Sequence, residues 1–334
     1  MSGLLIGLVG ALVATNQPLA VSNLIQQHTG VSVTLVNRDD PAEQELRRLM
    51  TEDETALDEV DKWIRDNRAF AARGAGESNE VLNRRIRARL DVVRKHYEEF
   101  LGRYPDSAHG HLAYGSFLND IGDEVAAVKQ CETAARLDPK NPTAWNLIAN
   151  FCSEHGPITN AFINYAKAIA LAPTESVYYQ NLAATVFLFR KDAMTFYGIT
   201  EPQVFDKALA LYRQAMQVDP RNFSLATDYA ESYYAIRPLR TNDALAAWTN
   251  ALQLAGDDSE RQQVNIHLAR IKMAAGRYAE ARAHLRDVTD GALAGTRHRL
   301  EILIAEREQP ATNPVSGATT NPAPPPGAAP TRAP

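Results

Sequence analysis

The sequence is short of the residues on which many enzymes and small secreted domains depend. Only two of its 334 residues are cysteines, Cys131 and Cys152, so neither a disulfide framework nor a paired C-x-x-C zinc site can form. Positive charge is not in excess either, because 35 Lys and Arg face 40 Asp and Glu, for a net charge of −5. A nucleic-acid-binding surface needs positive charge to displace counterions from phosphate, so we expect no nucleic-acid partner.

Sequence motifs of catalysis are missing as well. Gly74-Ala75-Gly76 lacks the third glycine of a phosphate-binding loop and follows no predicted strand. No G-x-S-x-G elbow occurs. His109-Gly110-His111 is not part of an H-E-x-x-H pattern and has no carboxylate at ligand spacing. We therefore predict a protein that is not an enzyme, with no catalytic residues, no cofactor and no metal ligands.

The first 25 residues are apolar but lack positive charge, since no Lys or Arg precedes Arg38. Leu4–Ala14 suits the core of a signal peptide, and Ala20-Val21-Ser22 offers small residues for cleavage. A membrane-spanning segment would carry Thr15-Asn16-Gln17-Pro18 in its middle, where polar groups are unfavourable. Residues 1–25 are thus an export signal, a membrane anchor or an apolar docking helix. The expected location is exported or membrane-associated, with the cytoplasm as the alternative.

Proline recurs at a fixed period. Pro105, Pro139 and Pro173 are 34 residues apart, and Pro220 follows 47 residues later. A period of this length indicates stacked helix–turn–helix units. Proline fits at the end of such a unit because it cannot continue the second helix.

The residues between these prolines resemble the tetratricopeptide-repeat (TPR) family, whose motif sets small and aromatic residues at fixed positions. The unit that begins at Pro142 carries the motif residues Trp145, Ile148, Ala149, Ala161, Tyr165, Ala168 and Pro173. The unit before it has His111 in place of the tryptophan and Cys131 in place of the aromatic. The resemblance covers residues 106–290 and implies an all-α, right-handed solenoid of about five helix pairs. It also implies that Trp145, Cys131 and Cys152 lie in the core, with a disulfide between the cysteines as the alternative.

Residues outside the repeats divide into four further segments. Residues 26–105 are predicted to be an N-terminal helical region with a degenerate half-repeat, formed by helices over residues 41–73 and 80–103. The acidic face of the first helix, which includes Asp53, is predicted to be solvated. Val31–Val36 alternates weakly and is predicted to be a short strand. A capping helix is expected at residues 291–309, and residues 310–334 form a Pro- and Ala-rich tail that we expect to be disordered.

The family resemblance implies that a peptide or protein partner binds along the concave groove made by the first helix of each pair. The residues expected to line this groove are Asn119, Asn146, Asn150, Gln180, Thr227, Glu231 and Tyr234. Amides among them can pair with the N–H and C=O groups of an extended peptide. The chaperone-binding subset of the family holds a carboxylate with basic groove residues. No Lys or Arg stands at the matching positions here, so a chaperone tail is not the expected partner.

The third repeat is interrupted by an insertion at residues 190–202. We expect its first helix to run past Phe189 and stop at Tyr197-Gly198, and Thr200 to cap the next helix. Met194, Phe196 and Tyr197 are candidate contacts with a partner, or else they pack on the neighbouring repeat. The predicted function is a non-catalytic protein-binding scaffold. The alternative is an envelope assembly factor or an enzyme accessory subunit, tethered or exported through residues 1–25, the only segment expected to touch a membrane.

Overall fold

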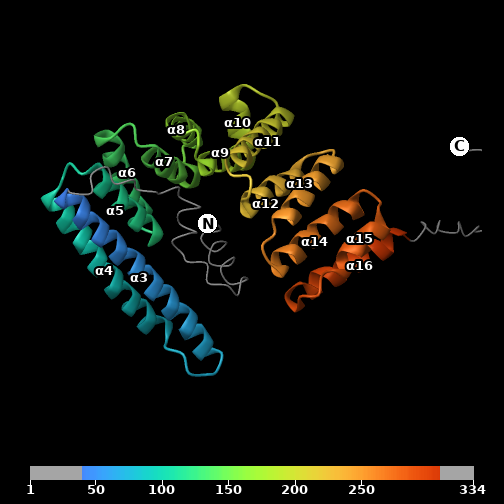
Figure 1. The fold of residues 1–334 in the computed structure, drawn as a ribbon, viewed down its shortest axis with the longest axis horizontal. Coiled ribbons are helices and arrows are strands. Elements are labelled where there is room, and N and C mark those ends of the chain that lie inside the picture. The colour runs from blue at the N-terminus through green and yellow to red at the C-terminus, as the bar shows by residue number, and fades with distance from the viewer. Residues whose placement is uncertain (1–39, 309–334) are drawn as a thin grey trace, which may run out of the picture. The chain divides into compact units, whose positions relative to one another are not determined.

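The computed structural model describes residues 40–308, and within this range it contains helices and no strand (Figure 1). The strand expected at Val31–Val36, the apolar residues 1–25 and the tail at residues 310–334 lie outside the described range. Among the helices of residues 40–308, none is both long enough and apolar enough to cross a membrane.

The chain divides into two compact units, residues 1–264 and 265–334, and the boundary falls within α14. The first unit holds α3 (Pro41–Ala71), α4 (Asn79–Arg103), α5 (Ala108–Asp120), α6 (Glu124–Leu137), α7 (Pro142–His155), α8 (Ile158–Leu171), α9 (Ser176–Leu188), α10 (Arg190–Tyr197), α11 (Glu201–Val218), α12 (Phe223–Glu231), the 3₁₀ turn η1 (Ser232–Ala235) and α13 (Thr241–Leu254). The second unit holds the rest of α14 (Asp258–Ala274), α15 (Tyr278–Arg286), the 3₁₀ turn η2 (Gly291–Leu293) and α16 (Ala294–Glu308). It has its own core, in which Ile266, Leu285 and Ile304 are buried together.

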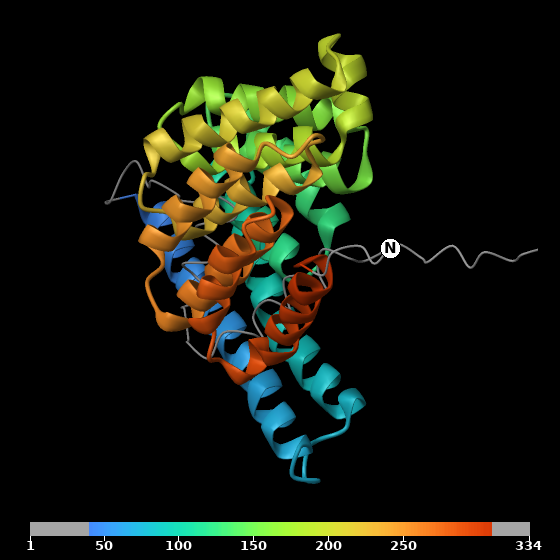
Figure 2. The ribbon, with the colours of Figure 1, turned by 90° about the vertical axis from the view of Figure 1, so that its right-hand side faces the viewer.

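The first two described helices form a long antiparallel hairpin, and both views show α3 and α4 running side by side (Figure 2). Each begins at a cap: the side chain of Asp40 accepts from the backbone N–H of Ala42, and that of Ser78 from the N–H of Val81. Tyr97 and Phe100 of α4 are fully buried and pack against α5. The helices predicted over residues 41–73 and 80–103 are confirmed.

The following helices pack as antiparallel pairs, α5 with α6, α7 with α8, α9 with α11 and α12 with α13. The alanines expected at the close approaches between helices are buried, with at most 5% of their surface exposed: Ala127, Ala134, Ala149, Ala161, Ala168, Ala183, Ala208, Ala215, Ala230, Ala244 and Ala251. A methyl group is the largest side chain that such an approach can hold. The repeat frame predicted from the prolines is therefore confirmed by the packing.

One hydrogen bond recurs at the start of three successive pairs. The indole Nε1 of Trp145 donates to the carbonyl of Pro139 at 3.0 Å, and the hydroxyl of Tyr179 donates to that of Pro173 at 3.2 Å. The Nε2 atom of His111 lies 2.9 Å from the oxygen of Pro105. The side chains of histidine, tryptophan and tyrosine can each carry an N–H or O–H group far enough from the helix to meet the proline carbonyl. This explains why His111 can stand where the motif has tryptophan.

The expectation that Trp145 lies in the core is wrong in part. Its side chain is half-buried, and the ammonium group of Lys167 lies 3.2 Å from the centroid of its ring. The indole N–H must reach the carbonyl of Pro139 in the turn, so the ring lies at the rim of the helix pair rather than between its helices.

The insertion forms a short helix of its own. The first helix of this pair, α9, ends at Leu188, and Phe189 breaks it with φ −99° and ψ 51°, so the prediction that this helix runs on to Tyr197 is wrong. Gly198 ends α10 with φ 65°, a left-handed conformation that glycine adopts without strain. The predicted cap at Thr200 is confirmed, because Thr200 and Gln203 form a reciprocal capping box at the start of α11.

Gly115 lies at a close approach between α5 and α6. A Cβ atom added there would lie 2.8 Å from Sγ of Cys131 and 3.2 Å from the backbone oxygen of Ala127. We expect Gly115→Ala to destabilise the protein by about 1–3 kcal/mol, because overpacking outweighs the gain in helix propensity. The control is Gly102→Ala in α4, where nothing lies within 4 Å of the added atom. This control should be stabilising by about 1 kcal/mol in urea melts. Equal effects at the two glycines would contradict the close approach of α5 and α6 at Gly115.

Candidate functional site

The candidate groove residues lie on the first helices of the pairs, and the surface that α5, α7, α9 and α12 share is called the first-helix face below. Asn119 near the end of α5 and Glu231 at the end of α12 are exposed. Asn150, Gln180, Thr227 and Tyr234 are half-buried, the last of them in the turn η1 that follows α12. Asn146 differs from the others, because none of its surface is exposed.

A row of amides joins α7 to α9. The amide nitrogen of Asn181 donates to Oδ1 of Asn146 at 3.0 Å and lies 3.5 Å from Oδ1 of Asn150. The hydroxyl of Tyr165 donates to Oδ1 of Asn150 at 2.7 Å. Burial raises the pKa of Tyr165 to about 12, so this phenol remains a donor at neutral pH. We expected Asn146 to be exposed and free to bind a partner. This expectation is wrong, because Asn146 holds two repeats together and its loss would leave a buried amide unpaired.

A second polar contact joins the next two first helices. Nε2 of Gln180 in α9 donates to Oδ2 of Asp228 in α12 at 2.7 Å. Polar side chains thus continue along the face from α7 to α12, each held by a neighbour from another helix. Amides and carboxylates fixed in this way can bind the polar groups of a peptide backbone, but they supply neither a nucleophile nor an acid–base pair.

The aromatic residues of the insertion contact the second pair. The ring of Phe162 in α8 lies 5.3 Å from that of Phe196 and 5.5 Å from that of Tyr197, measured between centroids. Met194 and Tyr197 are half-buried against the same cluster, whereas Phe196 keeps 39% of its surface exposed. Much of the apolar surface that the sequence assigned to a partner therefore covers Phe162, and Phe196 is the part that a partner can still reach.

Cys131 and Cys152 are both free and buried in one core cluster, as the repeat frame predicts. Burial raises the pKa of Cys131 to about 12, so its thiol stays protonated at neutral pH. A protonated, buried thiol behaves as a small apolar group and is not a nucleophile.

The acidic face of α3 is not wholly solvated, which corrects the prediction for Asp53. The hydroxyl of Tyr97 in α4 donates to the carboxylate of Asp53 in a short hydrogen bond. Burial, together with the charges of Glu54 and Glu52, raises the pKa of Asp53 to about 7. Burial and the charge of Asp53 also raise the pKa of Asp120, at the end of α5, to about 7. Three helices thus enclose two carboxyl groups that interact.

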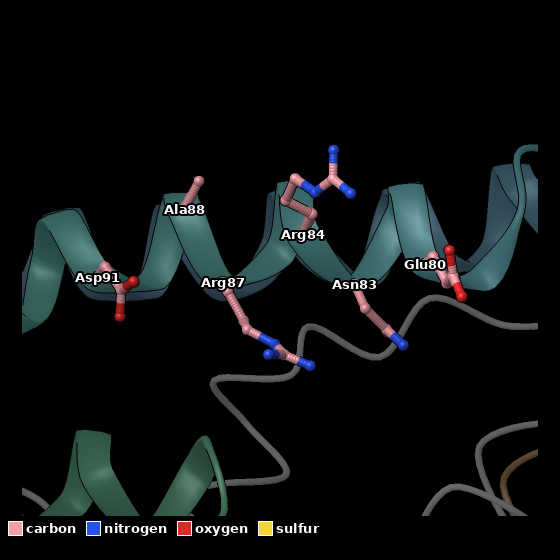
Figure 3. A pocket seen from close by; sticks show the side chains of 6 residues that line it. All are labelled: Glu80, Asn83, Arg84, Arg87, Ala88 and Asp91. Atoms are coloured by element: carbon pink, nitrogen blue, oxygen red, sulfur yellow. The ribbon is translucent and has the colours of Figure 1, made fainter.

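Among the hollows of the described surface, two are lined by polar or aromatic side chains. One, of about 480 Å³, runs along a single helix, where the side chains of Glu80, Asn83, Arg84, Arg87, Ala88 and Asp91 line it (Figure 3). The other, of about 600 Å³, lies between α11 and α13, and Tyr229 and Tyr233 contribute to its lining. The hydroxyl oxygens of these two tyrosines are 2.8 Å apart and bond to each other. Neither hollow contains the nucleophile with adjacent base that covalent catalysis requires.

One cluster has the composition of a metal site. Glu124 begins α6, and Glu154 and His155 end α7, and one ligand atom from each of the three lies within 4.8 Å of those from the others. Sequence reasoning missed this cluster because about 30 residues separate its two parts. The adjacent pair Glu154-His155 was the only signal in the sequence.

Comparisons with known proteins find similar folds but no close relative. No protein-family model and no curated protein matches the chain. Among solved structures, pilF of Pseudomonas aeruginosa is 16% identical, with a TM-score of 0.47, and the match covers 74% of this chain and 99% of pilF. YrrB, described as a TPR protein with an unusual peptide-binding site, is 11% identical, with a TM-score of 0.46, over 63% of this chain and 96% of its own. A TPR protein of Thermus thermophilus is 22% identical, with a TM-score of 0.41, over 60% of this chain and all of its own length (100%).

The repeats can be classified from the chain itself. Pro105, Pro139 and Pro173 are 34 residues apart, the helices pack in antiparallel pairs, and the alanines of the motif are buried where the helices meet. A 34-residue helix–turn–helix period is typical of tetratricopeptide-like helix pairs. The described residues therefore form successive TPR-like helix pairs, the fold class that the sequence predicts.

Proposed function

We propose that the protein is a non-catalytic scaffold that holds an extended segment of a partner protein along the first-helix face. The observation that carries this proposal is the continuous row of polar side chains from α7 to α12, in which Asn150 and Gln180 are held by neighbours but not fully buried. An extended peptide presents alternating N–H and C=O groups that such side chains can pair with.

Preorganisation supports the same conclusion. Binding normally loses the side-chain entropy of the groups that become ordered. Tyr165 already orders the side chain of Asn150 in the free protein, and Asp228 orders that of Gln180. Binding a peptide would therefore cost little further side-chain entropy at these two residues. The buried pair of Asn146 and Asn181 keeps α7 and α9 in register and acts through positioning rather than contact.

The ends of the face offer substitutions that leave the core intact. Asn119 and Glu231 are exposed, on α5 and α12, and Asn119→Arg with Glu231→Arg places two long charged side chains on the proposed path. The matched control is Glu132→Arg with Gln214→Arg, which makes the same two kinds of change at exposed positions of the second helices α6 and α11. Peptides selected from a random displayed library on the unmodified protein serve as the probe.

We expect the first-helix variant to bind the selected peptides at least about tenfold more weakly, a difference of about 1.4 kcal/mol, and the control to bind them unchanged. Both proteins should keep the melting temperature of the unmodified chain. If the selected peptides bind both variants equally, the first-helix face is not the site. In that event Phe196 of the insertion becomes the next surface to test, because it keeps 39% of its area exposed.

A further inference from the structure

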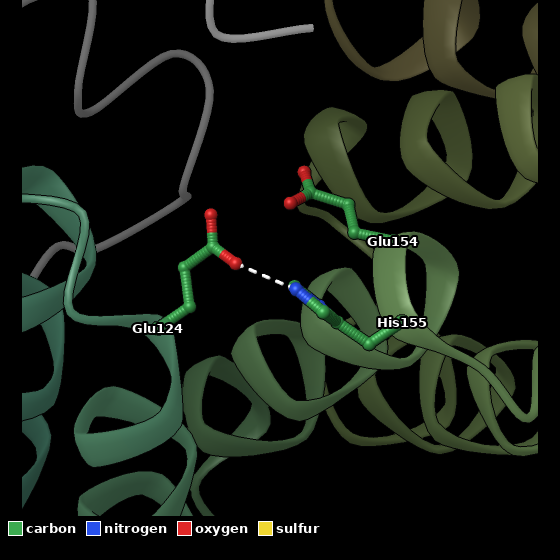
Figure 4. A group of neighbouring side chains, drawn as sticks. All are labelled: Glu124, Glu154 and His155. Carbon is green, nitrogen blue, oxygen red and sulfur yellow. Dashed lines mark ion pairs between the residues drawn. The ribbon is translucent and has the colours of Figure 1, made fainter. Parts of the chain in front are cut away.

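We propose that Glu124, Glu154 and His155 bind one divalent ion of the zinc type, which links the first helix pair to the second. The ligands come from both sides of this junction. Glu124 is the first residue of α6, the second helix of one pair, and the other two residues end α7, the first helix of the next (Figure 4). An ion held by all three would restrain the stacking of two repeats, in addition to their apolar contacts.

The spacing of the three side chains suits a small ion. Their ligand atoms all lie within 4.8 Å of one another, and Nε2 of His155 is 2.8 Å from Oε2 of Glu124. A tetrahedral zinc ion with bonds of about 2.0–2.2 Å places its ligand atoms roughly 3.5 Å apart. Rotations of the exposed Glu154 side chain and the half-buried Glu124 side chain would bring their oxygens to this geometry. Figure 4 shows both carboxylates directed to the same side as the imidazole.

The imidazole of His155 is oriented by a contact at its Nδ1 atom, on the side of the ring away from Glu124, as is usual for metal-binding histidines. Its Nδ1 atom lies 3.2 Å from the backbone oxygen of Phe151, and its ring stacks on that of Phe151 at 4.5 Å between centroids. A backbone acceptor on one ring nitrogen fixes the tautomer and leaves the other nitrogen for a metal. Nε2, the nitrogen that faces Glu124, is thus the one placed to bind a metal ion.

Charge favours a cation at this place. Two carboxylates face one imidazole, and within residues 40–308 no Lys or Arg forms an ion pair with Glu124 or Glu154. The imidazolium form can compensate only one of the two negative charges, whereas a divalent ion compensates both.

The donor set distinguishes between ions. Calcium and magnesium prefer sites made of oxygen atoms, while an imidazole nitrogen with carboxylate oxygens suits zinc and its neighbours. Three protein ligands leave a fourth position for water.

The test uses the full chain after chelator treatment, with zinc chloride as the probe in calorimetry and thermal melts. We expect one zinc ion per chain and a melting temperature about 5 °C higher at a hundredfold excess over Kd. Calcium and magnesium at the same concentration should leave it unchanged.

Glu154→Gln is the decisive variant, because it removes a ligand but leaves the pair between His155 and Glu124 in place. We expect it to weaken zinc binding at least about tenfold. The matched control is Glu301→Gln, which alters the exposed pair of His298 and Glu301, whose side chains are 4.0 Å apart, and should leave zinc affinity unchanged. Zinc affinity unchanged in Glu154→Gln, or no stoichiometric binding by the unmodified chain, would show that the cluster is an ion pair only.

Discussion

Replacing Phe162 with alanine is expected to lower the free energy of unfolding by about 3–5 kcal/mol. Phe162 has none of its surface exposed and belongs to the core cluster of the second repeat. Two rings from the insertion, Phe196 and Tyr197, pack against it, so its removal leaves a cavity that α8 alone cannot close. Urea denaturation measures the loss.

Trp145→Ala is the comparison for this prediction. The motif gives Trp145 the larger role, but its side chain is only half-buried. Its removal loses one hydrogen bond to Pro139, the contact with Lys167 and part of the packing against the core. We expect a loss of about 1–2 kcal/mol. If Trp145→Ala proves as destabilising as Phe162→Ala, the tryptophan carries more of the core than its exposure indicates.

The same substitution at Phe162 also reports on the insertion. Because α10 packs on α8 through these rings, Phe162→Ala should raise hydrogen exchange in residues 190–197 more than in α7. Equal protection in both proteins would mean that α10 is held by α11 instead.

The repeat frame could be predicted from sequence because it follows from local steric limits. Prolines follow the ends of second helices, and alanine occupies many of the places where two helices meet at the distance of a methyl group, as at Ala149 and Ala161. These requirements recur every 34 residues and can be counted without knowing any long-range contact. The break at Phe189 was missed because no glycine or proline stands there, and the backbone change is absorbed by an ordinary residue.

The polar sites were harder to predict, since the position of a polar residue on a helix does not reveal its partner. The family resemblance implies that Asn146 faces the groove, but in the structure Asn181 of the next repeat covers it. Helix periodicity placed Asp53 on a charged face, and only the crossing of α4 brings Tyr97 over it. A buried polar group is favourable only with its partner, so both residues of each pair must be located before either can be interpreted.

The partly buried carboxyl groups of Asp53 and Asp120 give the protein an expected dependence on pH. Burial raises the pKa of each from its ordinary value of 3.8 to about 7. A carboxyl group with a higher pKa in the folded chain binds more protons there than in the unfolded chain, so the free energy of unfolding falls as pH rises from about 4 to about 7. The stabilising state is the protonated one, and it is lost above neutral pH.

Asp53→Asn isolates this effect, because an amide oxygen can still accept the hydrogen bond from Tyr97 but carries no charge. We expect the variant to be more stable than the unmodified protein by about 2–4 kcal/mol at pH 8, and the difference to vanish toward pH 4. Asp58→Asn on the exposed face of the same helix should change stability by less than about 0.5 kcal/mol at either pH. Denaturant melts from pH 4 to pH 8 measure all three proteins.

Asp120→Asn should stabilise the Asp53→Asn variant less than it stabilises the unmodified protein. The reason is that the charge of Asp53 is one cause of the raised pKa of Asp120, and Asp53→Asn removes that charge. Two fully additive effects would mean that the carboxyl groups titrate independently, and a variant less stable than the unmodified protein at pH 8 would mean that the ionised Asp53 is stabilised where it lies.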